Sequence, residues 1–198
     1  MRLYWARNTR AFRIAWLLEE SGLPYERRVI DIRDESSRAD PEFRATSPMG
    51  KVPALEDGPA RLWDSGAICI YIADRYPETG LGPPIGHADR ARFLQWVTYT
   101  NSVVEPAMGE RFSKLEAKPS SYGWGSFDLM LATLKAGVAA ADPWILGEKF
   151  SAADVLLGVS SLYLRRFGLV GPDPVLDQYA ERCQARPAWQ RAQAFDAG

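Results

Sequence analysis

Residues 47–77, SPMGKVPALEDGPARLWDSGAICIYIADRYP, decide the fold of the first part of the chain. Residues 52–55 and 61–63 have the composition of short strands, and the turn signal at residues 57–59 separates them. Pro53 lies inside the first strand, although proline has no N–H to give to a sheet. We therefore expect a strand start or a sheet edge at Pro53, where an extended ligand can use the neighbouring backbone.

Strand and helix signals alternate on both sides of this stretch. Residues 1–5 and 25–32 are typical of strands. A helix is expected between a cap at Asn8 or Thr9 and the end signals Gly22 and Pro24. A polar segment at 33–46 mixes helix and loop, and a further helix runs from Ser65 to Pro77. This order predicts an α/β unit of about 80 residues.

The second part of the chain reads as entirely helical. Residues 77–86, PETGLGPPIG, hold three prolines and three glycines, which is typical of a linker. We place a first domain at 1–77, a linker at 78–86 and an all-helical domain at 87–198. Expected helices cover 87–114, with a kink at Pro106, and then 124–141, 151–167, 175–185 and 187–195. Ser151 and Asp154 have the spacing of a capping box at the third of these.

The composition excludes several classes of protein. The 198 residues are 46% hydrophobic and 25% charged with a net charge of −1, so no strong field for nucleic acid or an anionic membrane is expected. No apolar run is long enough to span a bilayer, and the charged start is unlike a secretory signal. Two cysteines, Cys69 and Cys183, are too few for a disulfide framework and form no metal motif. These features predict a cytoplasmic protein without a metal.

Two short motifs together suggest a socket for a small peptide. If the bond before Pro53 is cis, the N–H and C=O of Val52 can pair with an extended peptide, as in β-augmentation. At the next helix start, Ser65 and the helix N-terminus can hold a carboxylate. The carboxylate of Asp64 can accept hydrogen bonds from an ammonium group. The expected ligand is a small peptide with an α-amino-acid head.

These motifs resemble the cytosolic glutathione transferase superfamily over the whole chain. The resemblance rests on SPMGKVPAL, WDSGAICIYIADRYP and GEKFSAADVLLG, in this order. It implies a thioredoxin-like α/β domain followed by an all-α domain, and a homodimer. It also implies glutathione as cosubstrate on the first domain, an acceptor pocket on the second and no metal.

The resemblance assigns glutathione-binding roles to several residues. Val52, with Pro53, would pair with the cysteinyl part of glutathione. Asp64 and Ser65 would hold the γ-glutamyl head, and Lys51 can help with a carboxylate. Either Arg33 or Arg38 can reach the glycyl end.

Members of this superfamily stabilise the glutathione thiolate, usually with a Tyr, Ser or Cys near the first helix. Residues 4–12 contain no Ser or Cys, and Arg10 stands where beta-class relatives carry cysteine. We therefore expect Thr9 to be the catalytic donor, with Asn8 as a second donor and Arg10 as a cation beside the sulfur. Tyr4 is a weaker candidate. A plain capping role for Thr9 or Asn8 fits the sequence equally well.

The predicted reaction is addition of the glutathione thiolate to a small apolar electrophile. Tyr99 and Phe112, on the long helix of the second part, are the expected acceptor-pocket residues. One alternative is a glutathione-dependent disulfide reductase or peroxidase. Another is a glutathione-binding module without catalysis, since fold resemblance alone does not decide the reaction.

Overall fold

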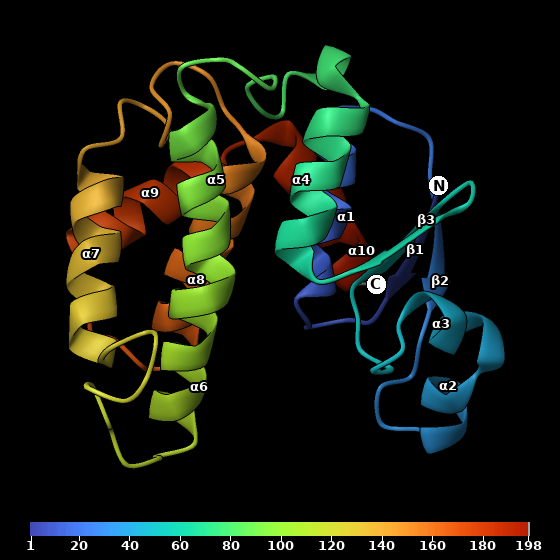
Figure 1. Cartoon of the computed structure of the whole chain (residues 1–198), viewed down its shortest axis with the longest axis horizontal. Coiled ribbons are helices and arrows are strands. Elements are labelled where there is room, and N and C mark those ends of the chain that lie inside the picture. The colour runs from blue at the N-terminus through green and yellow to red at the C-terminus, as the bar shows by residue number, and fades with distance from the viewer. Residues whose placement is uncertain (198) are drawn as a thin grey trace. The chain divides into compact units, whose positions relative to one another are not determined.

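The computed structural model describes residues 1–197 of the chain, and side chains up to Phe195. The chain forms two compact units (Figure 1). The first contains residues 1–81 together with the C-terminal segment from Arg186, and the second contains residues 82–185. The sequence-based division differs from this one, because it placed all of residues 87–198 in one helical domain.

The first unit is an α/β unit built on a four-stranded sheet in the order β2-β1-β3-β4. Strands β1 and β2 are parallel, whereas β1 and β3, and β3 and β4, are antiparallel. This is the expected thioredoxin-like arrangement. Its elements are β1 (Arg2–Trp5), α1 (Ala11–Ser21), β2 (Glu26–Val29), α2 (Glu35–Ala39), α3 (Pro41–Thr46), β3 (Ala54–Asp57), β4 (Ala60–Trp63), α4 (Ser65–Arg75), the 3-10 turn η1 (Pro77–Thr79) and α10 (Pro187–Ala197).

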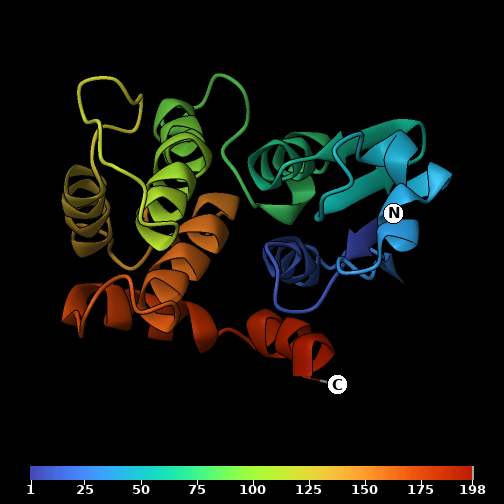
Figure 2. The same ribbon diagram turned by 90° about the horizontal axis from the view of Figure 1, so that it is seen from below.

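The strand registers divide the sheet into an apolar face and a face that carries many charges. Leu3 pairs with Leu55, and both side chains are fully buried. Their neighbours along each strand point to the opposite face, because successive side chains alternate. Helices α1 and α4 pack against each other beside the sheet, and α2 and α3 lie on its other side (Figure 2).

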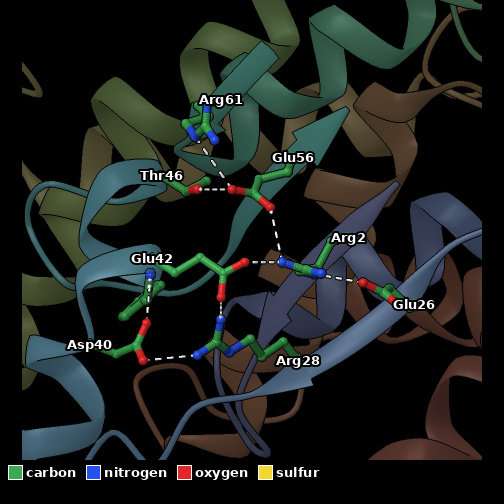
Figure 3. Close-up of polar contacts among 9 residues, drawn as sticks. Arg2, Glu26, Arg28, Asp40, Glu42, Thr46, Glu56 and Arg61 are labelled. Atoms are coloured by element: carbon green, nitrogen blue, oxygen red, sulfur yellow. Dashed lines mark hydrogen bonds and ion pairs between the residues drawn. The ribbon is translucent and has the colours of Figure 1, made fainter. Parts of the chain in front are cut away.

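A network of ion pairs attaches α3 to the charged face of the sheet (Figure 3). Arg2 contacts the carboxylates of Glu42 at the start of α3 and Glu56 of β3. Thr46, at the end of α3, donates its hydroxyl to Glu56 Oε1 at 2.8 Å. Arg28 contacts Glu42 as well. Because α3 leads directly into residues 47–53, this network fixes the approach to the start of β3.

The second unit is entirely helical. Its elements are α5 (Arg90–Tyr99), the π-helical segment η2 (Thr100–Val104), α6 (Glu105–Phe112), α7 (Phe127–Ala139), α8 (Ala152–Arg166) and α9 (Pro174–Gln184). The first three were expected as one helix with a kink at Pro106. The π-helical segment lies just before Pro106, which lacks the N–H that a regular helix would use four residues back.

The predicted capping box begins α8. The backbone N–H and the hydroxyl of Ser151 both donate to Asp154 Oδ2 at 2.8 Å. Asp154 Oδ1 accepts hydrogen bonds from the N–H of Ile145 at 2.8 Å and the hydroxyl of Tyr179 at 2.6 Å. Asp154 is fully buried, so this carboxylate joins the helix start, the preceding loop and α9 inside the core.

The last helix, α10, belongs to the first unit because of its apolar side chains. Trp189 is 3% exposed and packs edge-on against Phe12 and Trp16 of α1. Helix α10 therefore covers a side of α1 that the sheet leaves open.

Candidate functional site

Three segments that are far apart in sequence meet at one end of the sheet. Tyr4 pairs with Ala54, and Ala54 pairs with Trp63. Strand β3 therefore begins where its two antiparallel neighbours, β1 and β4, end. The segments that continue from this end are the turn at residues 6–10, residues 52–53 and residues 64–65.

The turn before α1 contains the predicted catalytic residues. Asn8 has a φ of 57°, in the left-handed region that asparagine tolerates better than most residues. The hydroxyl of Thr9 donates to the carbonyl of Ala6 at 2.6 Å and accepts from the N–H of Ala11 at 3.2 Å. A hydroxyl has one proton, so Thr9 uses its donor to close the turn. The side chains of Asn8 and Arg10 are exposed.

Residues 52–53 form the start of β3. The peptide bond between Val52 and Pro53 is cis, as expected from the sequence. Val52 is half-buried and packs against the cluster of Tyr4, Ile30 and Phe43. Within residues 1–197, no backbone hydrogen bond reaches the N–H or C=O of Val52. These two groups are available to an extended peptide.

Asp64 and Ser65 form the start of α4. One carboxylate oxygen of Asp64 accepts from the N–H of Gly66 at 3.0 Å and from the N–H of Ala67 at 3.4 Å. Asp64 has a φ of 77°, and Ser65 is 6% exposed. Asp64 therefore caps the helix and brings a negative charge to its N-terminus. The first backbone N–H groups of a helix point outward and favour an anion.

A cationic side chain, that of Lys51, lies on the segment that leads to Val52, and Arg38 lies beside this segment. Lys51 is exposed, and its backbone N–H and C=O are both bound by the hydroxyl of Ser47, at 3.0 and 2.8 Å. Gly50 has a φ of 62°, and a Cβ at this position would lie 3.2 Å from the carbonyl oxygen of Arg38. Arg38 of α2 is thus a neighbour of this segment, whereas Arg33 lies in the exposed turn before α2.

The sequence analysis did not identify Arg13, which is 1% exposed in α1. Burial raises the pKa of the Cys69 thiol. The positive charge of Arg13 lowers this pKa, and the negative charge of Asp64 raises it. Arg13 thus brings a buried cation into the core of the first unit. An arginine inside the apolar run Phe12–Ala15 was the signal that could have revealed it.

The two predicted acceptor-pocket residues have different environments. Tyr99 is 8% exposed, its hydroxyl donates to the carbonyl of Met130 at 2.6 Å, and burial raises its pKa to about 12. Tyr99 thus joins α5 to α7, and its expected contact with an acceptor stays a prediction. Phe112 is 66% exposed at the end of α6, with its ring centroid 6.2 Å from that of Phe167. A cavity of about 440 Å³ lies at this end of α6, between Leu115 and Phe127.

Both cysteines lie away from the turn in which the sulfur site is predicted. The thiols of Cys69 and Cys183 are both buried and form no disulfide among the described residues, and neither lies in the turn before α1. No group of three or more His, Cys, Asp or Glu side chains that could hold a metal ion occurs within residues 1–197. Over the same residues, no helix is long and apolar enough to cross a membrane.

Comparisons with known proteins identify the family. The family model described as "Glutathione S-transferase, N-terminal domain" matches residues 1–74. The glutathione S-transferase-like protein gedE of Aspergillus terreus is 31% identical over 159 residues, which cover 72% of this chain and 69% of that protein. The disulfide-bond oxidoreductase YfcG of Escherichia coli is 28% identical over 204 residues, covering 96% and 93% of the two chains.

A solved structure extends this similarity to the whole chain. A sphingomonad glutathione S-transferase complexed with glutathione is 28% identical, has a TM-score of 0.80 and covers 100% of this chain and 99% of its own. The chain belongs to the glutathione S-transferase family. The expected thioredoxin-like domain followed by a mostly helical remainder is confirmed.

Proposed function

We propose that the protein is a glutathione transferase that joins the sulfur of glutathione to small apolar electrophiles. The observation that carries this proposal is the meeting of the turn at 6–10, Val52–Pro53 and Asp64–Ser65 at one end of the sheet. It supplies a peptide-binding edge, an anion site and a turn for the sulfur within one small area.

Each part of glutathione has a proposed partner. The N–H and C=O of Val52 pair with the cysteinyl backbone, beside Pro53. Asp64 accepts from the γ-glutamyl ammonium, while the hydroxyl and N–H of Ser65 bind the γ-glutamyl carboxylate. Lys51 and Arg38 hold the glycyl carboxylate.

The sulfur is placed against the turn at residues 8–10. Asn8 donates from its exposed amide to the thiolate, and the guanidinium of Arg10 lowers the pKa of the thiol by its charge. Thr9 holds the turn through its two hydrogen bonds. Its hydroxyl donates to the thiolate only if it gives up its hydrogen bond to the carbonyl of Ala6. The thiolate then attacks the electrophilic carbon, and the leaving group departs with the electron pair of the broken bond.

Further parts of the proposal follow from the resemblance to the family. The acceptor contacts Phe112, whose exposed ring is available for an apolar ligand. We propose that the protein acts in the cytoplasm as a homodimer and detoxifies electrophiles. Glutathione serves as cosubstrate, and the proposed reaction uses no metal.

A second candidate reaction is glutathione-dependent disulfide reduction. It is favoured by the similarity to the disulfide-bond oxidoreductase YfcG. Because both cysteines of this chain are buried, glutathione would have to supply the attacking thiolate in this reaction too. Turnover of a small disulfide with little turnover of an aryl halide would favour this candidate over conjugation.

The test is the ultraviolet absorbance of the thiolate of bound glutathione, titrated with pH. We expect its pKa to lie well below that of free glutathione. Asn8→Gly removes the amide but keeps the positive φ accessible, and Asn8→Asp replaces the donor with an anion. Both variants should raise the pKa of the bound thiol, and Asn8→Asp should raise it more.

Thr9 is tested by a matched pair of variants. Thr9→Val keeps the shape and removes the hydroxyl, whereas Thr9→Ser keeps the hydroxyl. If Thr9 only holds the turn, Thr9→Val lowers stability and leaves the pKa of the bound thiol nearly unchanged. Binding of glutathione with the same pKa as in free solution would refute thiolate activation and leave a binding module as the better account.

A further inference from the structure

The C-terminal helix α10 packs against α1 (Figure 2). The ring of Trp189 stands edge-on to the rings of Phe12 and Trp16, with centroid distances of 4.7 Å in both cases. These three side chains are 3%, 5% and 0% exposed. Trp189 is therefore a packed core residue that comes from the far end of the chain.

Ion pairs hold the second half of α1 to the same helix and to Arg186, the residue before it. Arg186 donates to both carboxylate oxygens of Glu20, at 2.6 and 2.7 Å. Arg191 donates to Glu19 Oε2 at 2.8 Å and to the backbone carbonyl of Glu19 at 2.9 Å. The contacts of α10 thus divide into an apolar part near the start of α1 and a charged part near its end.

The apolar part is connected to the turn that precedes α1. Phe12 is the second residue of the helix, and its N–H donates to the carbonyl of Thr9 at 3.2 Å. The ring of Phe12 is held by Trp189, and its backbone is held by the turn. Glu19 is seven residues further on, about 10 Å along the helix axis.

We propose that Trp189 is a positioning residue for the sulfur of glutathione. It fixes Phe12, Phe12 fixes the turn at residues 8–10, and the turn places Asn8 and Arg10 against the thiol. The role in the reaction rests on the proposed function, in which this turn faces the sulfur. A displacement of Asn8 and Arg10 by about 1 Å is enough to weaken their effect on the thiol.

The chain offers variants that separate positioning from stability. The indole N–H of Trp189 donates to Gln193 within α10 at 3.3 Å, so its contact with α1 is ring packing alone. Trp189→Leu removes the aromatic edge, and Trp189→Phe retains one. Arg191→Gln is the matched control, because it weakens the same helix pair at the end remote from the turn.

Two measurements on the full-length variants test the proposal. Amide hydrogen exchange of the ligand-free protein should become about tenfold faster or more in residues 8–13 of Trp189→Leu, relative to Arg191→Gln. With glutathione bound, the pKa of its thiol should rise in Trp189→Leu and return toward the wild-type value in Trp189→Phe. It should stay at the wild-type value in Arg191→Gln.

The outcomes separate this proposal from the proposed function. Equal exchange in residues 8–13 of Trp189→Leu and Arg191→Gln would overturn the positioning role. An unchanged thiol pKa in Trp189→Leu would also overturn it, provided that the wild type lowers that pKa. If the wild type does not lower it, the proposed function fails, and the exchange measurement still decides whether Trp189 positions the turn.

Discussion

Asp64 combines two roles that substitution can separate, because it caps α4 and is the proposed partner of the γ-glutamyl ammonium. Its carboxylate accepts from the N–H groups of Gly66 and Ala67, and its φ is 77°. Asn has a similar preference for helix caps, but it carries no charge. Alanine provides no cap.

The structure gives different stability costs for the two variants. Asp64→Ala loses the cap, and we therefore expect it to lower the free energy of unfolding by about 1–2 kcal/mol. Asp64→Asn loses only the favourable interaction of a negative charge with the helix N-terminus, about 0.5 kcal/mol.

Glutathione binding should show a different pattern. A hydrogen bond to a charged group contributes about 1.5–3 kcal/mol, which corresponds to a loss of roughly 10- to 150-fold in affinity. Both variants remove the charge, so both should bind glutathione more weakly by this factor. Asp64→Asn would thus be nearly as stable as the wild type and yet poor at binding.

The assays are urea unfolding, followed by circular dichroism, and titration calorimetry with glutathione. Wild-type affinity in Asp64→Asn would refute the assignment of the ammonium to Asp64. Equal stability of the two variants would refute the reasoning on the cap. The two results are independent of each other.

Two further predictions concern the fold. Gly137→Ala in α7 would place a Cβ 2.2 Å from the ring of Trp96 and should destabilise the fold by about 1–2 kcal/mol. Gly109→Ala in α6 would add a Cβ that meets no atom within 4 Å beyond the neighbouring helix backbone, so it should stabilise the fold by up to about 1 kcal/mol. Urea unfolding measures both variants, and equal effects would contradict this prediction. The hydrogen bond from Tyr76 to Asp57 raises the pKa of Tyr76 to about 12. In the unfolded state this tyrosine ionises at about pH 10. The free energy of unfolding should therefore fall as the pH rises from about 10 to 12. Asp57→Asn should lower this pKa, measured by tyrosinate absorbance, and an unchanged titration would count against it.

Local motifs were readable from the sequence because their physics is local. Pro53 cannot join a sheet ladder, Asp64 before Ser65 is a helix start, and Ser151 and Asp154 have the spacing at which a cap and its partner meet. The structure has a strand start at Ala54, helix starts at Ser65 and Ala152, and the capping box. The order of strands and helices also followed from short patterns.

Helix lengths and side-chain environments were less predictable. Tyr99 has an apolar body and a polar tip, which suit a pocket wall as well as a core. Its environment was decided by the carbonyl of Met130, 31 residues away, which accepts its hydroxyl. The charge of Arg13 argued against burial, and the tertiary structure nevertheless buries it in α1.

By itself the sequence determined which segments form strands and helices, where several of them begin, and the family to which they belong. Only the tertiary structure decided that the turn at residues 6–10, Val52 and Asp64 lie at one end of the sheet, and that α10 packs on α1. The first set depends on neighbours within a few residues. The second depends on strand register and on apolar surfaces such as those of Phe12 and Trp189, which are 177 positions apart and become neighbours only when both are buried.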